Sequence, residues 1–263
     1  DKVLASKQLK LTARSGFSAQ HTFYITLKEP GLQQFQVDVE RLDEEVTYRN
    51  NQRNFFIKVL ENRLKIALFA GAPHPDIGAL RNTFAGERYE FETFIRKSTT
   101  TWYQPPPESL TDYDLFILHN FPAVQNDRDL LKRMIARAEA DNTPMMHLVG
   151  QQTNFRILPE LKDYMALTPG RANDEASEAF LYLTGGYEQH ASFRFSADRA
   201  AFNTWLETAP PLLRNDAQWE ASPGATVYGK AKIKGITLQY PMFALAEQDG
   251  YKNMTLVGEN LWR

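Results

Sequence analysis

Apolar and polar residues alternate in four short stretches near the start of the chain. The alternation occupies residues 9–13, 23–27, 35–39 and 55–59. Pro30-Gly31 and Asn50-Asn51 stand between stretches as turn signals. Alternation punctuated by turns is typical of half-buried antiparallel strands. Because a β-sandwich usually has about seven strands, the pattern predicts a partial, all-β sandwich over residues 1–62.

From residue 64 the pattern changes to continuous apolar runs separated by helical spacing. The runs occupy residues 65–70, 113–118 and 145–149, and helical spacing follows over 76–85 and 127–140. Unbroken apolar runs are typical of parallel strands buried on both faces. The alternation of strand and helix predicts an α/β domain over residues 63–263. We expect a flavodoxin-like, three-layer sheet with helices on both faces.

The rest of the chain is less regular. We expect a strand over 89–95, a proline-containing surface loop over 99–108 and a helix over 197–208. Further strands are predicted over 226–229, 232–239, 242–246 and 254–257. They would extend the sheet with antiparallel edges.

Composition narrows the possible functions. The 263 residues carry a net charge of −2 without a lysine or arginine stripe, which argues against a nucleic-acid-binding face. The absence of cysteine excludes disulfides, thiolate nucleophiles and cysteine-liganded zinc. No apolar run approaches the roughly 20 residues that span a bilayer.

Several stretches, in this order along the chain, resemble two known modules. One set of stretches resembles the end of an immunoglobulin-like module: Pro30-Gly31-Leu32 with its alternating strand, Asn50-Asn51, and residues 55–59. A second set resembles strands of a class I glutamine amidotransferase-like domain: the first strand at residues 63–76, the next core strand at 113–119, and the closing strands at 240–243 and 258–263. This pair of modules is found in bacterial membrane-anchored proteins of the von Willebrand factor A and aerotolerance-operon type.

The resemblance implies a cellular context. It implies a soluble, extracytoplasmic (periplasmic) part of a larger membrane-anchored protein, although a cytoplasmic location stays open. The chain starts at Asp1 and stops at Arg263, directly after a strand-like run. We interpret it as a segment of a longer protein.

The resemblance also bears on catalysis. Amidotransferases carry a cysteine at a sharp strand-to-helix turn and a later His-x-Glu pair. In the comparable stretch, residues 144–151, Val149 occupies the nucleophile position, and valine has no nucleophilic atom. No Gly-x-Ser-x-Gly elbow or Walker sequence occurs. The resemblance therefore implies the fold without the ancestral chemistry.

Polar residues follow three of the predicted buried strands. They are His74, Asp76, His119, Asn120, Gln151 and Thr153. Ligands of open α/β sheets bind beyond the carboxyl ends of the strands, so these side chains are predicted to line one pocket. The alternative is structural, with Asp76 and Thr153 capping helices. Two histidines and an aspartate could bind a metal, but we expect no metal and no cofactor.

These observations favour a non-catalytic binding or scaffolding module with protein partners. The alternatives are a hydrolase-like enzyme or a small-molecule sensor that uses the strand-end pocket. His147, inside the third apolar run, is expected to be a hydrogen-bonded core residue.

Overall fold

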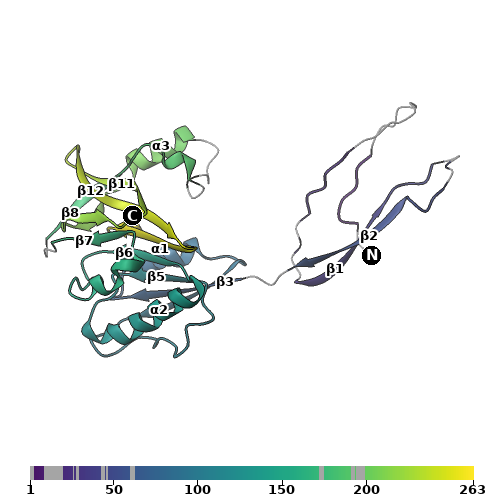
Figure 1. Ribbon diagram of the computed structural model, residues 1–263. Helices are drawn as coiled ribbons and strands as arrows, with labels where there is room; N and C mark the ends of the chain where they lie inside the picture. The colour runs from purple at the N-terminus through teal and green to yellow at the C-terminus, as the bar shows by residue number, and fades with distance from the viewer. Residues whose placement is uncertain are drawn as a thin grey trace. The chain divides into compact units, whose positions relative to one another are not determined.

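A computed structural model describes most of the chain. The described residues are 3–8, 20–25, 27, 30–42, 45, 47–59, 63–171, 175–190, 193 and 199–263. The chain divides into two compact units, Asp1–Asn62 and Arg63–Arg263 (Figure 1). Each unit is described by itself below.

The first unit contains one antiparallel strand pair, β1 (Gly31–Asp38) with β2 (Gln52–Val59). Phe35 and Phe55 stack across the pair with ring centroids 5.6 Å apart. Two predicted strands are thereby confirmed. The prediction for 23–27 is wrong where the structure describes it, because residues 23–25 and 27 lie outside any strand. The stretch 9–13 lies outside the described residues, and an immunoglobulin-like sandwich is not shown.

The second unit is a mixed α/β fold built on a nine-stranded mixed sheet (Figure 1). Along the sheet the strands are β4 (Tyr89–Ile95), β3 (Leu64–Ala70), β5 (Leu115–His119), β6 (Met145–Val149), β13 (Tyr251–Val257), β12 (Ile236–Gln248), β11 (Ala225–Ile233), β8 (Ala176–Leu183) and β9 (Leu212–Asn215). Pairing is parallel from β4 to β13 and antiparallel from β13 to β9.

The parallel half of the sheet carries the core. Phe69, Phe116 and Leu148 are almost completely buried there, which is why these strands read as unbroken apolar runs. The helices are α1 (Pro75–Thr83), α2 (Arg128–Asp141) and α3 (Arg199–Thr208). Helix α2 buries most of its predicted apolar stripe, and its C-cap is Asn142, whose φ is 55°.

Several elements were not predicted. A second small sheet pairs β7 (Leu167–Pro169) with β10 (Trp219–Ala221), and β8 and β9 extend the large sheet. Short 3₁₀ helices in the described part of the chain include η1 (Gln125–Asp127), η2 (Leu158–Tyr164) and η3 (Tyr187–Gln189). The antiparallel half is therefore much larger than the edges that the sequence predicted.

A buried ion pair fixes the loop that follows β4. Arg96, 5% exposed, donates to the carboxylate of Asp127 and lies over the ring of Trp102, 4.3 Å from its centroid. The same carboxylate accepts the backbone N–H groups of Ala123 and Val124 at 2.8 and 2.9 Å. The ion pair therefore connects β4, the predicted proline-containing loop and the start of α2.

Candidate functional site

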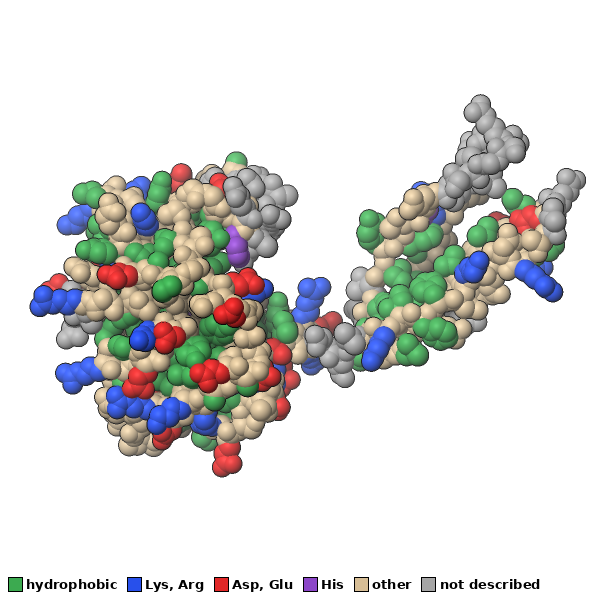
Figure 2. Space-filling model, viewed as in Figure 1, with side chains coloured by type: hydrophobic (Ala, Val, Ile, Leu, Met, Phe, Trp, Pro, Cys, Tyr) green, Lys and Arg blue, Asp and Glu red, His purple; other side chains and the backbone are tan. Residues whose placement is uncertain are grey.

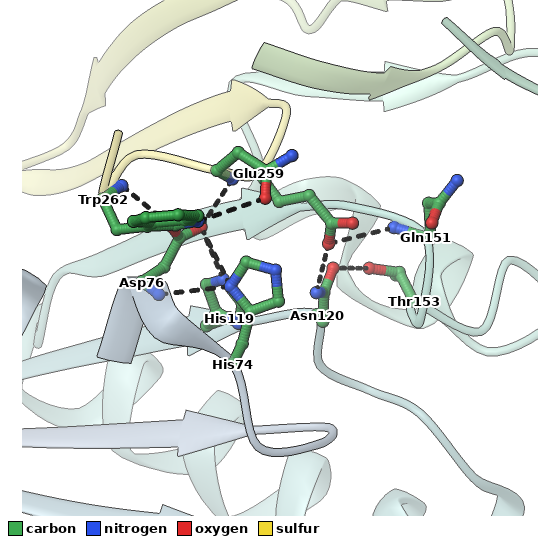
Figure 3. Close-up of polar contacts among 9 residues, drawn as sticks. His74, Asp76, His119, Asn120, Gln151, Thr153, Glu259 and Trp262 are labelled. Carbon is green, nitrogen blue, oxygen red and sulfur yellow. Dashed lines mark hydrogen bonds and ion pairs between the residues drawn. The ribbon is translucent and has the colours of Figure 1, made fainter. Parts of the chain in front are cut away.

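The carboxyl ends of β3, β5, β6 and β13 meet at one edge of the sheet (Figure 3). His74 precedes α1 and is its N-cap, because its Nδ1 accepts the N–H of Asp76 at 3.2 Å. The predicted cap, Asp76, lies instead inside the first turn. Thr153 does not cap an α-helix either: its hydroxyl lies 3.5 Å from Oδ1 of Asn120.

Asp76 is the centre of the first polar cluster. It is 0% exposed, and its Oδ2 lies 3.1 Å from Nε2 of His119 and 3.4 Å from Nδ1 of His74. Its two carboxylate oxygens also accept the backbone N–H groups of Asn260, at 2.9 Å, and Trp262, at 3.1 Å. A single carboxylate therefore joins α1, β5 and the segment after β13.

The hydrogen bonds keep this carboxylate ionised. Burial alone would raise the pKa of Asp76 because it disfavours the charged form. The hydrogen bond and charge of His119, the charge of His74 and the N–H of Asn260 outweigh burial and lower the pKa below its ordinary value. Asp76 is therefore an anion at neutral pH.

One ring nitrogen in this cluster stays without a partner. Nδ1 of His119 is buried and makes no hydrogen bond to the described residues. A buried polar atom left unpaired costs about 1–3 kcal/mol. The hydrogen bond of Nε2 and the packing against the ring of His74, with centroids 4.9 Å apart, hold the ring in place.

A second cluster lies beside the first and is centred on Glu259. Its Oε2 accepts the side-chain amide of Asn120 at 2.6 Å and lies 3.4 Å from the backbone nitrogen of Gln151. Asn120 follows β5 with φ of 50°, a left-handed conformation that asparagine tolerates. A Cβ at Gly150 would lie 2.2 Å from Oε2 of Glu259, so only glycine permits this close approach.

The structure thus brings five of the six predicted side chains into these two clusters. The exception is Gln151, which is exposed and reaches Glu259 through its backbone. The four buried members bond to one another or to Glu259, although Nδ1 of His119 stays unpaired, and a pocket lined by the six residues stays a prediction. Among these six, only His74 and Gln151 are more than marginally exposed.

Sequence reasoning missed three contributors: Glu259, Asn260 and Trp262. The sequence was read as ending in antiparallel edge strands, whereas β13 pairs parallel with β6 in the middle of the sheet. A parallel β13 places the residues after it at the same edge as those after β3, β5 and β6. The only available signal was a polar Gly258-Glu259-Asn260 sequence following an apolar strand.

Val149 does not occupy a nucleophile elbow. It is the last residue of β6, 2% exposed, and pairs in register with Val257 of β13. A turn follows, and the next helical element is η2, which begins at Leu158. The stretch therefore lacks the strand-to-helix turn that the family comparison placed there. Val149 is therefore a core strand residue, and its side chain carries no information about catalysis.

His147 is a hydrogen-bonded core residue, as predicted. It is 1% exposed, and its Nε2 lies 2.9 Å from the carbonyl oxygen of Tyr164. Burial lowers the pKa of His147 to about 4, although the bond to Tyr164 acts in the opposite direction. The ring is therefore neutral at physiological pH.

The first cluster also holds the residues that could ligate a metal. His74, Asp76 and His119 each offer one ligand atom, and these atoms lie within 4.8 Å of one another. The second cluster contributes one carboxylate and amide groups, which already bond to each other.

Comparisons with known proteins bear on the fold. No protein-family model and no curated protein matches the sequence. A protein from Parabacteroides merdae described as ThuA-like has a similar structure, with 10% identity, a TM-score of 0.48, and coverage of 74% of this chain and 79% of that one.

Two Salmonella typhimurium proteins described as cytoplasmic are also similar. One has 10% identity, a TM-score of 0.49, and coverage of 89% of this chain and 88% of that one. The other has 10% identity, a TM-score of 0.47, and coverage of 88% and 85%. Similarities of this size say nothing about activity.

No finding supports the predicted extracytoplasmic location, and the descriptions of the two Salmonella neighbours differ from it, because both are described as cytoplasmic. Among the residues that the structure describes, no helix is both long and apolar enough to cross a membrane. No comparison supports a von Willebrand factor A context.

Proposed function

We propose that residues 63–263 form a non-catalytic binding module in which the strand-end clusters are structural. The observation that carries the proposal is that two buried carboxylates accept hydrogen bonds from within the domain. Asp76 accepts bonds from His119, Asn260 and Trp262, and Glu259 accepts the amide of Asn120. A general base or nucleophile must reach a substrate atom, whereas both oxygens of Asp76 and Oε2 of Glu259 already accept hydrogen bonds within the domain.

Recognition would then use another surface. A concavity of about 630 Å³ is lined by aromatic and aliphatic side chains of β8, η3 and α3 together with three charged residues. Phe180 and Tyr182 are 44% and 49% exposed there. Exposed aromatic side chains are enriched at protein interfaces. Glu188, Glu207 and Lys232 give the surface more negative than positive charge.

The partner that fits this surface is a protein segment that presents an apolar side chain next to a basic one. Elsewhere, on the face shown in Figure 2, acidic and basic side chains of the second unit are interspersed. Nucleic acid requires a clustered basic face, so a protein partner is favoured.

The first unit would belong to the same binding protein. We propose that it is part of an immunoglobulin-like module, on the basis of its antiparallel β1–β2 pair and the resemblance of its sequence. A solution structure of residues 1–62 that lacked a second sheet packed on this pair would contradict this assignment.

A turnover assay tests the absence of catalysis. The purified chain is incubated with generic amide, ester and phosphate substrates beside a His119→Asn variant. We expect both proteins to give the background rate. Turnover by the original chain that the variant lacks would overturn the proposal.

A capture experiment tests recognition. Three proteins are expressed as bait in the host cell and cross-linked to their neighbours there. They are the original chain, the double variant Phe180→Ala/Tyr182→Ala and the control Tyr103→Ala. Tyr103 is 63% exposed and lies outside the β8 surface, so its variant controls for the loss of an exposed aromatic ring. We expect one captured protein to be lost only from the double variant. Equal capture by all three would exclude this surface.

A further inference from the structure

We propose that His74, Asp76 and His119 bind one divalent transition-metal ion, with Zn²⁺ as the best fit. His74 and Asp76 come from the start of α1, and His119 ends β5 (Figure 3). Nε2 of His119 and Nδ1 of His74 lie 3.1 and 3.4 Å from Oδ2 of Asp76. With metal–ligand bonds of about 2.0–2.2 Å, ligand atoms of a tetrahedral zinc site are about 3.3–3.5 Å apart. Two of the three separations are thus close to ligand spacing, and all three ligand atoms lie within 4.8 Å of one another.

His74 already brings a potential ligand atom next to the carboxylate of Asp76. Its Nδ1 accepts the N–H of Asp76 at 3.2 Å and lies 3.4 Å from Oδ2 of the same residue. In the neutral imidazole, the form that ligates metals, this nitrogen presents a lone pair beside the carboxylate oxygen. A metal ion would take both lone pairs, in place of the 3.2 Å N–H bond to His74.

The ring of His119 is placed to ligate through Nε2. It is 0% exposed, its Nε2 lies 3.1 Å from Oδ2 of Asp76, and its ring packs against that of His74 with centroids 4.9 Å apart. A metal bond would replace the hydrogen bond of Nε2 with a stronger interaction. The ring would then carry its proton on Nδ1, which has no hydrogen-bond partner among the described residues.

The ligand set selects the class of ion. Two imidazole nitrogens and one carboxylate oxygen suit zinc and its neighbours in the first transition row, whereas Ca²⁺ and Mg²⁺ prefer oxygen ligands. The backbone N–H groups of Asn260 and Trp262 orient the carboxylate of Asp76, as outer-shell partners commonly do. The side chain of His74 is 17% exposed, whereas those of Asp76 and His119 are buried, so the ion would enter past His74.

Calorimetric titration of ZnCl₂ into the chelator-treated, 263-residue chain tests the site. The informative variant is His74→Asn, because asparagine keeps the N-cap and removes the imidazole. The matched control is His21→Asn, which removes a histidine of the first unit. We expect one ion per chain and a Kd raised at least about tenfold in His74→Asn, since loss of outer-shell partners alone costs about 10–100-fold. His21→Asn should bind like the original chain.

The proposal of a metal site would be overturned if the original chain showed no heat of Zn²⁺ binding. It would also be overturned if all three proteins bound Zn²⁺ with equal affinity. Co²⁺ gives a second readout that does not depend on heat. We expect visible d–d absorption from a four-coordinate ion, lost in His119→Asn protein that retains its native circular dichroism. Retention of the bands in that variant would also overturn the proposal.

The metal site and the non-catalytic function can fail separately. Metal binding without turnover of amide, ester or phosphate substrates supports both. Metal-dependent turnover that is lost in His74→Asn supports the site and contradicts the non-catalytic function. Absence of binding with no turnover removes only the site.

Discussion

Asp76 and Glu259 are carboxylates that belong to distant parts of the sequence yet lie at one edge of the sheet. Asp76 is 0% exposed and Glu259 is 6% exposed. Each accepts hydrogen bonds from residues that are far away in the sequence. Burial of a charge is costly unless such bonds compensate it. The stability of the second unit should therefore be sensitive to single atoms of these side chains.

Asp76→Asn is expected to lower the free energy of unfolding by about 3 kcal/mol. The amide keeps the shape but cannot accept from His119, Asn260 and Trp262 with both of its terminal atoms. Urea denaturation in chelator measures the loss. Asp129→Asn, whose side chain is 93% exposed, should change stability by less than about 0.5 kcal/mol. Equal losses in the two variants would contradict a structural role for Asp76.

Two glycine substitutions should change the free energy of unfolding in opposite directions. Gly150→Ala places a Cβ 2.2 Å from Oε2 of Glu259 and should destabilise by about 1–3 kcal/mol. Gly78→Ala lies in α1 with no atom within 4 Å of the added Cβ, so it should stabilise by about 0.5–1 kcal/mol. Differential scanning calorimetry compares the two. A stable Gly150→Ala protein would show that Glu259 can move away at little cost.

Between elements, the ion pair of Arg96 and Asp127 connects the end of β4 with the start of α2. It is buried, and two backbone N–H groups complete the coordination of the carboxylate. The surface pair of Arg128 and Glu160 also connects two elements, α2 and η2, but both side chains are partly exposed, at 47% and 37%. The two ion pairs therefore allow a buried pair to be compared with an exposed one at the adjacent residues Asp127 and Arg128.

Asp127→Ala should therefore cost about 3–5 kcal/mol, because it leaves the guanidinium of Arg96 buried without its anion. Glu160→Ala should cost at most about 1 kcal/mol, since solvent screens an exposed pair. Chemical denaturation of both proteins provides the comparison. Similar small losses would mean that water reaches Arg96 once its partner is removed.

Within the second unit, the sequence predicted elements that have a regular apolar pattern and missed β8 and β9, which are irregular or short. The strands β3, β5 and β6 are buried on both faces, and α2 buries a single stripe. By contrast, β8 mixes the buried Ala179 with the exposed Phe180, and β9 has only four residues. The site was half predicted, because the direction of β13, which places Glu259 and Trp262, depends on long-range pairing that no local pattern records.

For the second unit as a whole, acid stability depends on buried groups that resist protonation. In the folded state the pKa of His147 is about 4, whereas its ordinary value is 6.5. Between these values the unfolded chain binds a proton that the folded chain does not. Stability is therefore fully present above pH 6.5 and is lost as the pH falls toward 4.

The difference corresponds to about 3 kcal/mol, so the free energy of unfolding should fall by about that amount between pH 7 and 4. In His147→Gln, an amide can still donate to the carbonyl of Tyr164 but does not titrate. Urea denaturation across this range should give the variant a flatter profile. Identical slopes would show that other groups dominate. The lowered pKa of Asp76 adds a further loss below its ordinary value of 3.8.

The order of strands in the sheet has a consequence for synthesis. Of the nine strands, β13 is the last to leave the ribosome, yet it lies between β6 and β12 and joins the parallel half to the antiparallel half. Until residues 251–257 emerge, both halves present an unpaired strand edge, the feature through which nascent chains aggregate. A chaperone that shields β6 during translation would therefore be expected to raise the yield of native protein.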